Sequence, residues 1–221
     1  YLKEIMKQIH SVSKYKNQPL SSETVEKLVE AGQSASTSSY LQTYSIIGVE
    51  DPSIKARLKE VSGQPYVLEN GYLFVFVLDY YRHKLVDEKA ESNMETSYGS
   101  AEGLLVGTID VALVAQNMAV VAEDMGYGIV YLGSLRNDVA RVREILDLPE
   151  YTFPLFGMAV GVPADEENGS PKPRLPLEHV FHKNYYDASN DQQRRELEKY
   201  DTVVSDYYTE RTNGERSETW S

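Results

Sequence analysis

Residues 71–79 have the sequence Gly71-Tyr72-Leu73-Phe74-Val75-Phe76-Val77-Leu78-Asp79, from which the central strand of the fold is predicted. Side chains of a β-strand alternate between the two faces of a sheet, so an unbroken apolar run is apolar on both faces. A strand of this kind is typical of a sheet that is covered on both sides. We therefore predict a central sheet with helices packed against each face.

The longest predicted helix, residues 99–125, is apolar around its whole circumference. Its apolar side chains are Leu104, Leu105, Ile109, Val111, Ala112, Val114, Ala115, Met118, Val120 and Val121. A helix that is apolar on all sides is expected to be buried on all sides, and a subunit interface is a natural way to achieve this in a short chain. Gly126 follows where a left-handed C-cap is expected. Asp110 is interpreted as a hydrogen-bonded structural carboxylate, because a buried charge has to be paired.

Further helices and strands alternate along the chain. The predicted elements are a weak helix over 2–9, a helix opened by residues 19–23 with a serine cap, helices over 52–61 and 138–146, and strands over 44–49, 129–132 and 156–162. Residues 82–98 are polar and charged and are predicted to form an exposed loop or a short helix. The alternation favours an α/β or α+β protein with helices on both faces of one sheet.

The composition is that of a globular protein of 221 residues, with 41% hydrophobic and 25% charged residues. No run approaches the roughly 20 apolar residues that cross a bilayer, so no membrane partner is expected. The net charge of −12 repels a phosphate backbone and argues against nucleic acid as a partner. The absence of cysteine excludes disulfides, a thiol nucleophile and cysteine-based metal sites, and it fits a reducing cytoplasm.

The composition changes after Pro163. Residues 163–186 are rich in proline, lysine and aromatic residues without periodicity. Residues 190–210 have the pattern of a charged helix, and the polar tail over 211–221 is predicted to be a loop. We interpret residues 1–162 as the core and residues 163–221 as an extension that wraps around it.

Several polar patterns suit a binding site, and each also has a purely structural interpretation. The loop over 34–39 is either a polar connector or a surface that recognises the polar edge of a ligand. Lys172 and Arg174 stand on either side of a proline and form either a solvated basic turn or an anion clamp. His179 and His182 are interpreted as surface or packing residues, not as metal ligands. No G-x-G-x-x-G, Walker A or G-x-S-x-G pattern supports a Rossmann, P-loop or hydrolase site.

A series of short motifs covers nearly the whole chain. They are His10-Ser11-Val12-Ser13-Lys14-Tyr15, Ser36-Thr37-Ser38-Ser39-Tyr40-Leu41-Gln42, Gly63-Gln64, Asp110-Val111-Ala112, Ala115-Gln116-Asn117, Tyr131-Leu132-Gly133-Ser134-Leu135-Arg136-Asn137, Leu155-Phe156-Gly157, Lys172-Pro173-Arg174-Leu175-Pro176, and Arg211 and Arg216 with Thr219-Trp220-Ser221. In this order the chain resembles the nitroreductase superfamily, in its branch of flavin reductase P and oxygen-insensitive NADPH nitroreductases. The Lys-Pro-Arg-Leu-Pro and Thr-Trp-Ser segments are specific to that branch.

The resemblance implies an α+β, nitroreductase-like fold with a mainly antiparallel sheet flanked by helices. It also implies a homodimer that is intertwined through the long helix and binds FMN at its interface. The residues that would bind FMN are His10, Ser11, Ser13, Lys14, Ser38, Ser39, Gln64, Tyr131, Leu132, Gly133, Ser134, Lys172 and Arg174. Lys172 and Arg174 would place positive charge near the N1–O2 edge of the flavin. His10 and Ser13 depart from the resembled family, which usually has arginines at these two positions.

The resemblance further implies an oxidoreductase that moves a hydride from NADPH to FMN, then electrons to nitroaromatic, quinone or flavin acceptors by a ping-pong mechanism. No side chain acts as a catalytic residue, because the flavin carries the chemistry, and no metal is expected. Arg211 and Arg216 would hold the 2′-phosphate of NADPH, which NADH lacks. Residues 1–162 would bind FMN, and residues 163–221 would contribute to cofactor and NADPH binding. The alternatives are a flavin-binding protein with little or no turnover and a purely structural dimer.

Overall fold

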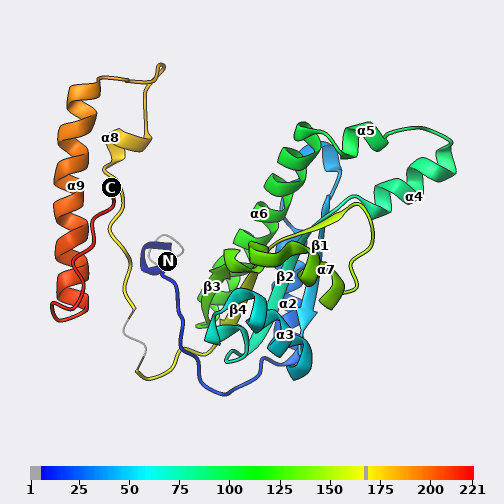
Figure 1. The fold of residues 1–221 in the computed structure, drawn as a ribbon, viewed down its shortest axis with the longest axis horizontal. Helices are drawn as coiled ribbons and strands as arrows, with labels where there is room; N and C mark the ends of the chain where they lie inside the picture. Colours follow the sequence, from blue (N-terminus) through cyan, green and yellow to red (C-terminus); the bar gives the residue numbers. More distant parts are fainter. Residues whose placement is uncertain (1–5, 167–168) are drawn as a thin grey trace. The chain divides into compact units, whose positions relative to one another are not determined.

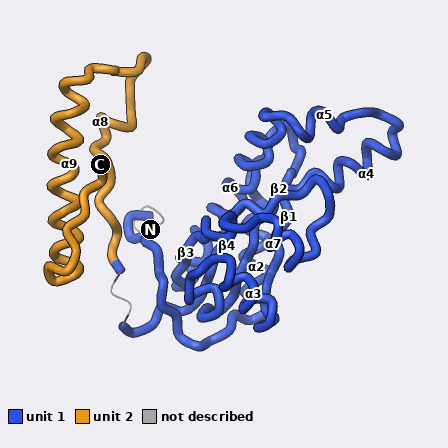
Figure 2. Tube along the Cα trace, viewed as in Figure 1, with its two compact units in different colours: residues 1–169 blue, residues 170–221 orange. Residues whose placement is uncertain are grey.

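The computed structural model describes residues 6–166 and 169–221 of the chain. The chain folds into two compact units, residues 1–169 and residues 170–221 (Figure 2). The first unit contains the sheet, and the second is built around one long helix (Figure 1). Residues 6–8 are helical, while residues 2–5 of the predicted weak N-terminal helix lie outside the described residues.

In the described part of the first unit, the sheet has four strands in antiparallel pairs. In spatial order they are β1 (Tyr44–Val49), β2 (Tyr72–Asp79), β4 (Thr152–Gly161) and β3 (Gly128–Leu132). The antiparallel sheet with helices packed against it confirms the predicted α+β fold. Strands β1 and β3 lie at the two edges of this sheet.

Strand β2 is buried along its whole length, and it separates two hydrophobic clusters. One cluster includes side chains of α2 (Ser22–Gln33) and α6 (Ala101–Asp124). The other includes side chains of α3 (Pro52–Ser62) and α7 (Val139–Ile145). The residues of β2 in the first cluster are Tyr72, Phe74, Phe76 and Leu78, and those in the second are Leu73, Val75 and Val77. The predicted burial of this strand on both faces is therefore confirmed.

Capping side chains begin helices α2, α3, α6 and α7 of the first unit. The caps of α2, α3, α6 and α7 are Ser21, Asp51, Ser100 and Asp138, whose side-chain oxygens accept backbone N–H groups of the first turn. The remaining helical elements described in this unit are α4 (Tyr81–Ala90), α5 (Glu95–Tyr98), η1 (Ser38–Tyr40), η2 (Pro65–Val67) and η3 (Gly133–Asp138). Most of the segment 82–98 is thus helical. Gly126 has φ of 86°, which confirms the left-handed position predicted after α6.

The predicted start of the last strand, at Phe156, is wrong, because β4 begins at Thr152. Pro154 lacks an N–H group and argues against a central strand in this segment. The structure accommodates it with a bulge, since Phe76 pairs with Phe156 while the next residue, Val77, pairs with Pro154. One residue of β4 is left over between these pairs.

Helix α6 is buried on one side only within a single chain. Val111, Val114, Ala115 and Met118 are fully buried on its inner side. Four other apolar side chains of α6, with exposed fractions between 45% and 58%, are Leu104, Leu105, Ile109 and Leu113. The expected burial on all sides is therefore not reached within one chain.

Helix α6 is also the one helix among the described residues that is long and apolar enough to cross a membrane. The sequence-based expectation that no segment reaches this limit is wrong for α6 by length and composition. A core helix passes the same test, and α6 packs against α2 and β2 through its buried side.

The second unit consists of α9 (Asn190–Arg211) with the preceding and following chain beside it. The preceding chain contains the short helix α8 (Leu177–Val180). The Tyr200 hydroxyl donates to the Pro173 carbonyl at 3.0 Å. The backbone N–H groups of Trp220 and Ser221 each donate to the Asp201 carboxylate at 2.9 Å. The polar tail is therefore fastened to the helix that precedes it.

Substituting Gly128 by alanine tests how closely the N-terminal segment packs on β3. A Cβ atom at Gly128 would lie 2.5–2.8 Å from three atoms of the buried Val12. We expect Gly128→Ala to lower the free energy of unfolding by about 1–3 kcal/mol through overpacking. In the control, Gly99→Ala, the nearest atom to the new methyl is 3.7 Å away, so stability should stay the same or rise by up to about 1 kcal/mol. Equal denaturation curves for the two variants would contradict this packing.

Candidate functional site

The N-terminal segment lies beside β3 and the end of β4. The Val12 N–H donates to the Ile129 carbonyl at 2.9 Å, and Ser11 forms a parallel bridge with Ile129. Further along, the Ala164 N–H donates to the Lys14 carbonyl at 3.0 Å. Val12 points into the packed interior, while Ser11 and Ser13 on either side of it are exposed, as expected for extended chain. The predicted cofactor residues His10, Ser11, Ser13 and Lys14 are thus held along one edge of the sheet.

A second group of predicted residues gathers where β3 ends. The Ser134 and Ser62 hydroxyl oxygens are 2.6 Å apart. Ser62 ends α3, and Gln64 follows it after the left-handed Gly63, which has φ of 71°. Leu132 is buried just before this point, and Gly133 is exposed. The structure therefore brings the end of α3, two residues before Gln64, against the predicted segment 132–134.

Tyr131, also a predicted cofactor residue, points from β3 toward α6. Its hydroxyl lies 3.4 Å from the Gln116 side-chain oxygen, and its ring meets the Phe156 ring edge-on at 5.7 Å. Glu123 lies seven residues after Gln116, about 10 Å further along α6. Burial raises the pKa of the Glu123 carboxyl to about 7, and the nearby His10 opposes that rise. Glu123 had not been predicted as part of the site.

The Ser38–Ser39 turn is held by Asp110 of α6. Asp110 is fully buried, and its carboxylate accepts the Ser38 N–H at 2.9 Å, the Thr43 N–H at 3.2 Å and the Thr43 hydroxyl at 2.8 Å. This confirms the interpretation of Asp110 as a hydrogen-bonded structural carboxylate. Ser39, Tyr40 and Gln42 have φ of 50°, 58° and 53°, which non-glycine residues seldom adopt.

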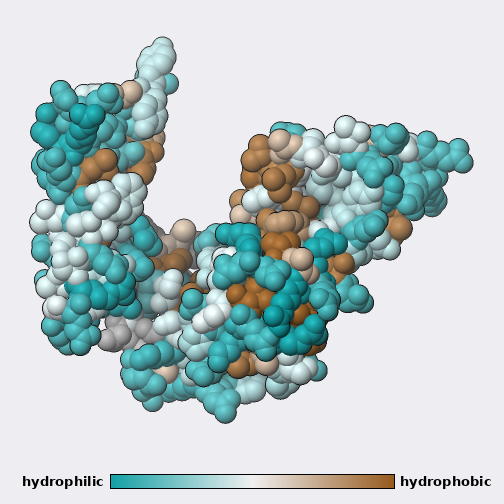
Figure 3. All heavy atoms as spheres, in the orientation of Figure 1, coloured by the Kyte–Doolittle hydropathy of each residue, from teal (hydrophilic) through white to brown (hydrophobic). Residues whose placement is uncertain are grey.

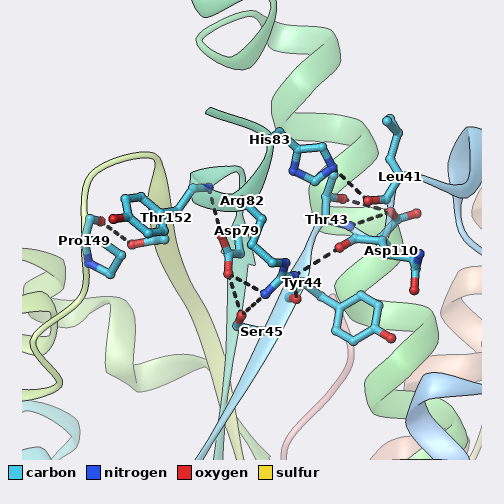
Figure 4. A network of polar contacts seen from close by, with 12 residues as sticks. Leu41, Thr43, Tyr44, Ser45, Asp79, Arg82, His83, Asp110, Pro149 and Thr152 are labelled. Atoms are coloured by element: carbon cyan, nitrogen blue, oxygen red, sulfur yellow. Dashed lines mark hydrogen bonds and ion pairs between the residues drawn. The ribbon is translucent and has the colours of Figure 1, made fainter. Parts of the chain in front are cut away.

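Helix α4 holds the same stretch of chain from another side (Figure 4). The Arg82 guanidinium donates to the carbonyls of Gln42 and Tyr44 and also pairs with Asp79 at 3.1 Å. The His83 ring nitrogen Nε2 lies 2.8 Å from the Leu41 carbonyl oxygen. These residues fall in the segment 82–98, whose charged sequence gave no indication of contacts with the chain around residue 42.

In the second unit, Lys172 and Arg174 line a cavity of about 410 Å³ together with aromatic side chains. The Lys172 ammonium lies 5.9 Å from the centre of the Tyr208 ring. The aromatic lining residues are Tyr200, Tyr207, Tyr208 and Trp220. This arrangement combines positive charge with flat apolar surface, which suits an anionic ligand with a ring system.

Arg211 and Arg216, the predicted NADPH-phosphate residues, lie near the end of α9. The Arg211 guanidinium donates to the Tyr207 hydroxyl at 3.1 Å. Arg216 lies over the Tyr208 ring at 5.1 Å and pairs with Glu218, whose carboxylate raises the pKa of the guanidinium. Both arginines thus contact neighbouring side chains of their own unit.

Within the first unit, one group of the predicted residues lies along the N-terminal segment, and a second lies where Ser62, two residues before Gln64, meets Ser134. The Ser38–Ser39 turn is attached to α6 instead. Lys172, Arg174, Arg211 and Arg216 belong to the second unit, and their share in a common site is a proposal.

The chemistry of these side chains fits FMN. Serine hydroxyls and the Gln64 amide suit the polar edges of the ring and the ribityl chain, while lysine and arginine suit the phosphate. Gly133 is exposed and has no side chain, which lets a flat ring approach the backbone. No group of three or more His, Asp or Glu side chains suited to a metal ion occurs among residues 6–166 and 169–221. Of the two histidines considered earlier, His182 accepts the Asp187 N–H at 3.2 Å.

Family models match almost the whole chain. The model described as "Nitroreductase family" matches residues 6–162, and "Nitroreductase family, C-terminal domain" matches residues 172–221. A protein of Staphylococcus epidermidis named NADPH-dependent oxidoreductase is 86% identical over 221 residues, which cover 100% of this chain and 88% of that protein. A protein of the same name from Staphylococcus aureus strain N315 is 68% identical with the same coverage.

Solved structures of the same kind share the fold. The NfrA1 nitroreductase from B. subtilis has a TM-score of 0.96 and 45% identity, covering 100% of this chain and 89% of that one. The NADPH:FMN oxidoreductase from Vibrio harveyi, complexed with NAD+, has a TM-score of 0.82 and 34% identity, covering 98% and 93%.

Glu123 makes stability depend on pH. Its pKa of about 7 in the folded chain exceeds the ordinary value of 4.5, so the folded chain binds this proton more tightly than the unfolded chain. The free energy of unfolding should therefore fall as pH rises from about 4.5 to 7. Glu123→Gln should remove this fall. Above pH 7 its free energy of unfolding should exceed that of the wild type by about 1–2 kcal/mol, a value that already allows for solvent screening of a half-buried group. Urea denaturation at pH 4.5 and pH 8 measures the free energy of unfolding of both proteins. A difference between variant and wild type that is the same at both pH values would contradict the raised pKa of Glu123.

Proposed function

The chain belongs to the nitroreductase family, and on this premise we propose that it binds FMN and uses NADPH to reduce small, flat electron acceptors. It is an NADPH-dependent oxidoreductase, as its relatives at 86% and 68% identity are named. FMN as the cofactor, nitroaromatic, quinone or flavin acceptors and a ping-pong mechanism are the finer parts of the proposal. The observation that carries it is the contact of Ser62, two residues before Gln64, with Ser134 directly after β3.

The side chains divide the task of holding the cofactor. FMN, when bound, supplies the redox chemistry by taking a hydride from NADPH and passing electrons to the acceptor. Ser134 and Gln64 would orient the ring through hydrogen bonds, and buried Leu132 would support it from below. Lys172 and Arg174 would supply positive charge to the N1–O2 edge. His10, Ser11, Ser13, Lys14, Ser38, Ser39 and Tyr131 would complete the contacts.

The same proposal assigns roles to the two parts of the chain and a place in the cell. Residues 1–162 would form the FMN-binding core, and residues 163–221 would add cofactor and NADPH contacts. The matches of separate family models to residues 6–162 and 172–221 support this division. A cytoplasmic location is part of the proposal, and a chain without cysteine needs no oxidising compartment for disulfides.

Flavin titration tests the proposed function. The purified chain, stripped of any flavin, is titrated with FMN and then mixed anaerobically with NADPH. We expect saturable FMN binding, bleaching of the flavin absorbance by NADPH, and its return when a quinone is added. Binding without bleaching would favour the second candidate, a flavin-binding protein with little or no turnover. This candidate is supported by His10 and Ser13, which stand where the family usually has arginines. Failure to bind FMN would contradict both candidates.

We also propose that the active form is a homodimer through α6. Leu104, Leu105, Ile109 and Leu113 leave an apolar face of this helix open to solvent within one chain. Figure 3 shows hydrophobic surface gathered over α6. A second chain would cover these side chains and remove their apolar area from water.

Charged substitutions on this face test the dimer. Leu105 and Ile109 are four residues apart and share a face of the helix, so Leu105→Asp with Ile109→Asp should bury charge in the interface and yield monomers. Leu85→Asp on α4 is the control, because Leu85 is exposed to a similar extent, 48%, away from α6. Sedimentation velocity distinguishes the forms, and a monomeric wild type would refute the proposal. Met118 is unsuitable as a probe because it is fully buried within the chain.

The proposed phosphate contacts predict a selective loss of NADPH use. Arg211→Ala and Arg216→Ala should each lower kcat/KM for NADPH about 10–100-fold, since a charge-assisted contact contributes roughly 1.5–3 kcal/mol. Turnover with NADH should hardly change, because NADH lacks the 2′-phosphate. Arg194→Ala is a matched control, since it removes the same charge about 25 Å away on the same helix. Equal losses with both nucleotides in FMN-saturated enzyme would leave Arg211 and Arg216 without this role.

A further inference from the structure

Asp110 is an unusual residue for its surroundings. It is fully buried in the middle of α6, beside Val111 and Val114 of the hydrophobic core. No ion pair to Asp110 occurs within the described ranges 6–166 and 169–221. Its charge is instead met by N–H and O–H donors, and all of these come from the chain between Ser38 and Thr43. A buried carboxylate of this kind is costly unless its hydrogen bonds are complete.

The turn that Asp110 holds has a backbone that its sequence does not favour. Ser39, Tyr40 and Gln42 all have positive φ, and none of them is glycine. Such conformations persist only where surrounding contacts impose them, and they gather at binding sites. Oδ1 of Asp110 accepts the Ser38 N–H at the start of the strained stretch, and Oδ2 accepts both Thr43 donors at its end. The carboxylate therefore bridges the two ends of the turn.

The stretch between these two ends is held by α4 (Figure 4). Arg82 binds the carbonyls of Gln42 and Tyr44, and His83 lies against the Leu41 carbonyl. The backbone is thus fixed, whereas Ser39 and Tyr40 at the tip stay exposed, Tyr40 to 82%. A rigid backbone with exposed polar side chains is the arrangement that ligand recognition requires.

We propose that Asp110 is a positioning residue for the flavin, which it serves by holding the Ser38–Ser39 turn in its strained conformation. The inference rests on the proposed function, because it takes Ser38 and Ser39 as FMN contacts. Asp110 itself lies in the core and touches no cofactor. Its effect on FMN passes through the Ser38 amide and through Thr43, which is also fully buried.

Asp110→Asn replaces one acceptor oxygen of the side chain and leaves the side-chain volume almost unchanged. An asparagine amide has one oxygen and one NH2 group, so in either orientation one of the two backbone N–H groups, that of Ser38 or that of Thr43, faces a donor. We expect the dissociation constant of FMN to rise at least tenfold and the midpoint potential of the bound flavin to shift. Amide hydrogen exchange over residues 38–43 should become faster at the same time.

Thr43 supplies a milder pair of variants in case Asp110→Asn folds poorly. Thr43→Val removes one donor to Asp110 and should weaken FMN binding several-fold, while Thr43→Ser keeps the hydroxyl and should restore binding to within about twofold of the wild type. Val142→Ala is the stability control, because Val142 is fully buried in the other hydrophobic cluster. It should lower the melting temperature and leave the FMN dissociation constant within about twofold.

The readouts separate the inference from the proposed function. The FMN dissociation constant is measured by fluorescence titration of the full-length apoprotein, and the melting temperature is recorded for each variant. Asp110→Asn and Thr43→Val that bind FMN like the wild type would overturn the positioning role alone. The positioning role would also be overturned if Val142→Ala weakened FMN binding to the same extent at an equal fall in melting temperature. A wild-type chain that fails to bind FMN would instead overturn the proposed function, and the inference with it.

Discussion

The structure depends on the burial of β2 on both faces. Its side chains alternate between two hydrophobic clusters, so neither face of the sheet can be left to water. Helices α2 and α6 cover one face, and α3 and α7 cover the other. Because β2 and β4 occupy the middle of the sheet, β1 and β3 become its edges. The segments that carry the candidate site are those beside the edges, where polar groups can reach a ligand.

The two edges use different means to fix polar chain on an apolar core. At β3, the N-terminal segment adds a backbone hydrogen bond to Ile129 and packs Val12 against Gly128, which has no side chain. Before β1, the turn at Ser38 is fixed by the buried Asp110 carboxylate and by Arg82. In both cases the anchoring side chain, Val12 or Asp110, is buried in the core, while the neighbouring polar side chains stay exposed to solvent. A site that rests on such supports needs little reorganisation when a ligand binds.

Helix α6 contributes to the core, to the turn before β1 and to the surroundings of Tyr131 on β3. Its inner side completes the core through Val114 and Met118, Asp110 reaches the turn before β1, and Gln116 and Glu123 lie toward Tyr131 and His10. Its outer side carries exposed leucines. One helix thus connects the core, both edges of the candidate site and the surface that we assign to dimerisation, so a change in its packing would reach all of them.

The sequence alone predicted the two-sided strand, the long helix, most other elements and the family, because alternation, helical periodicity and caps are local patterns. It also indicated residue types whose chemistry would suit FMN. It missed the bulge in β4, the contacts of Arg82 and the surroundings of Glu123. The tertiary structure alone placed Ser62 against Ser134 and identified the exposed side of α6. The physical reason is that these features depend on packing between segments distant along the chain. Likewise, Ser39 and Tyr40 have positive φ in a turn that contains no glycine and whose two ends, Ser38 and Thr43, bind Asp110 from 72 and 67 residues away in the sequence.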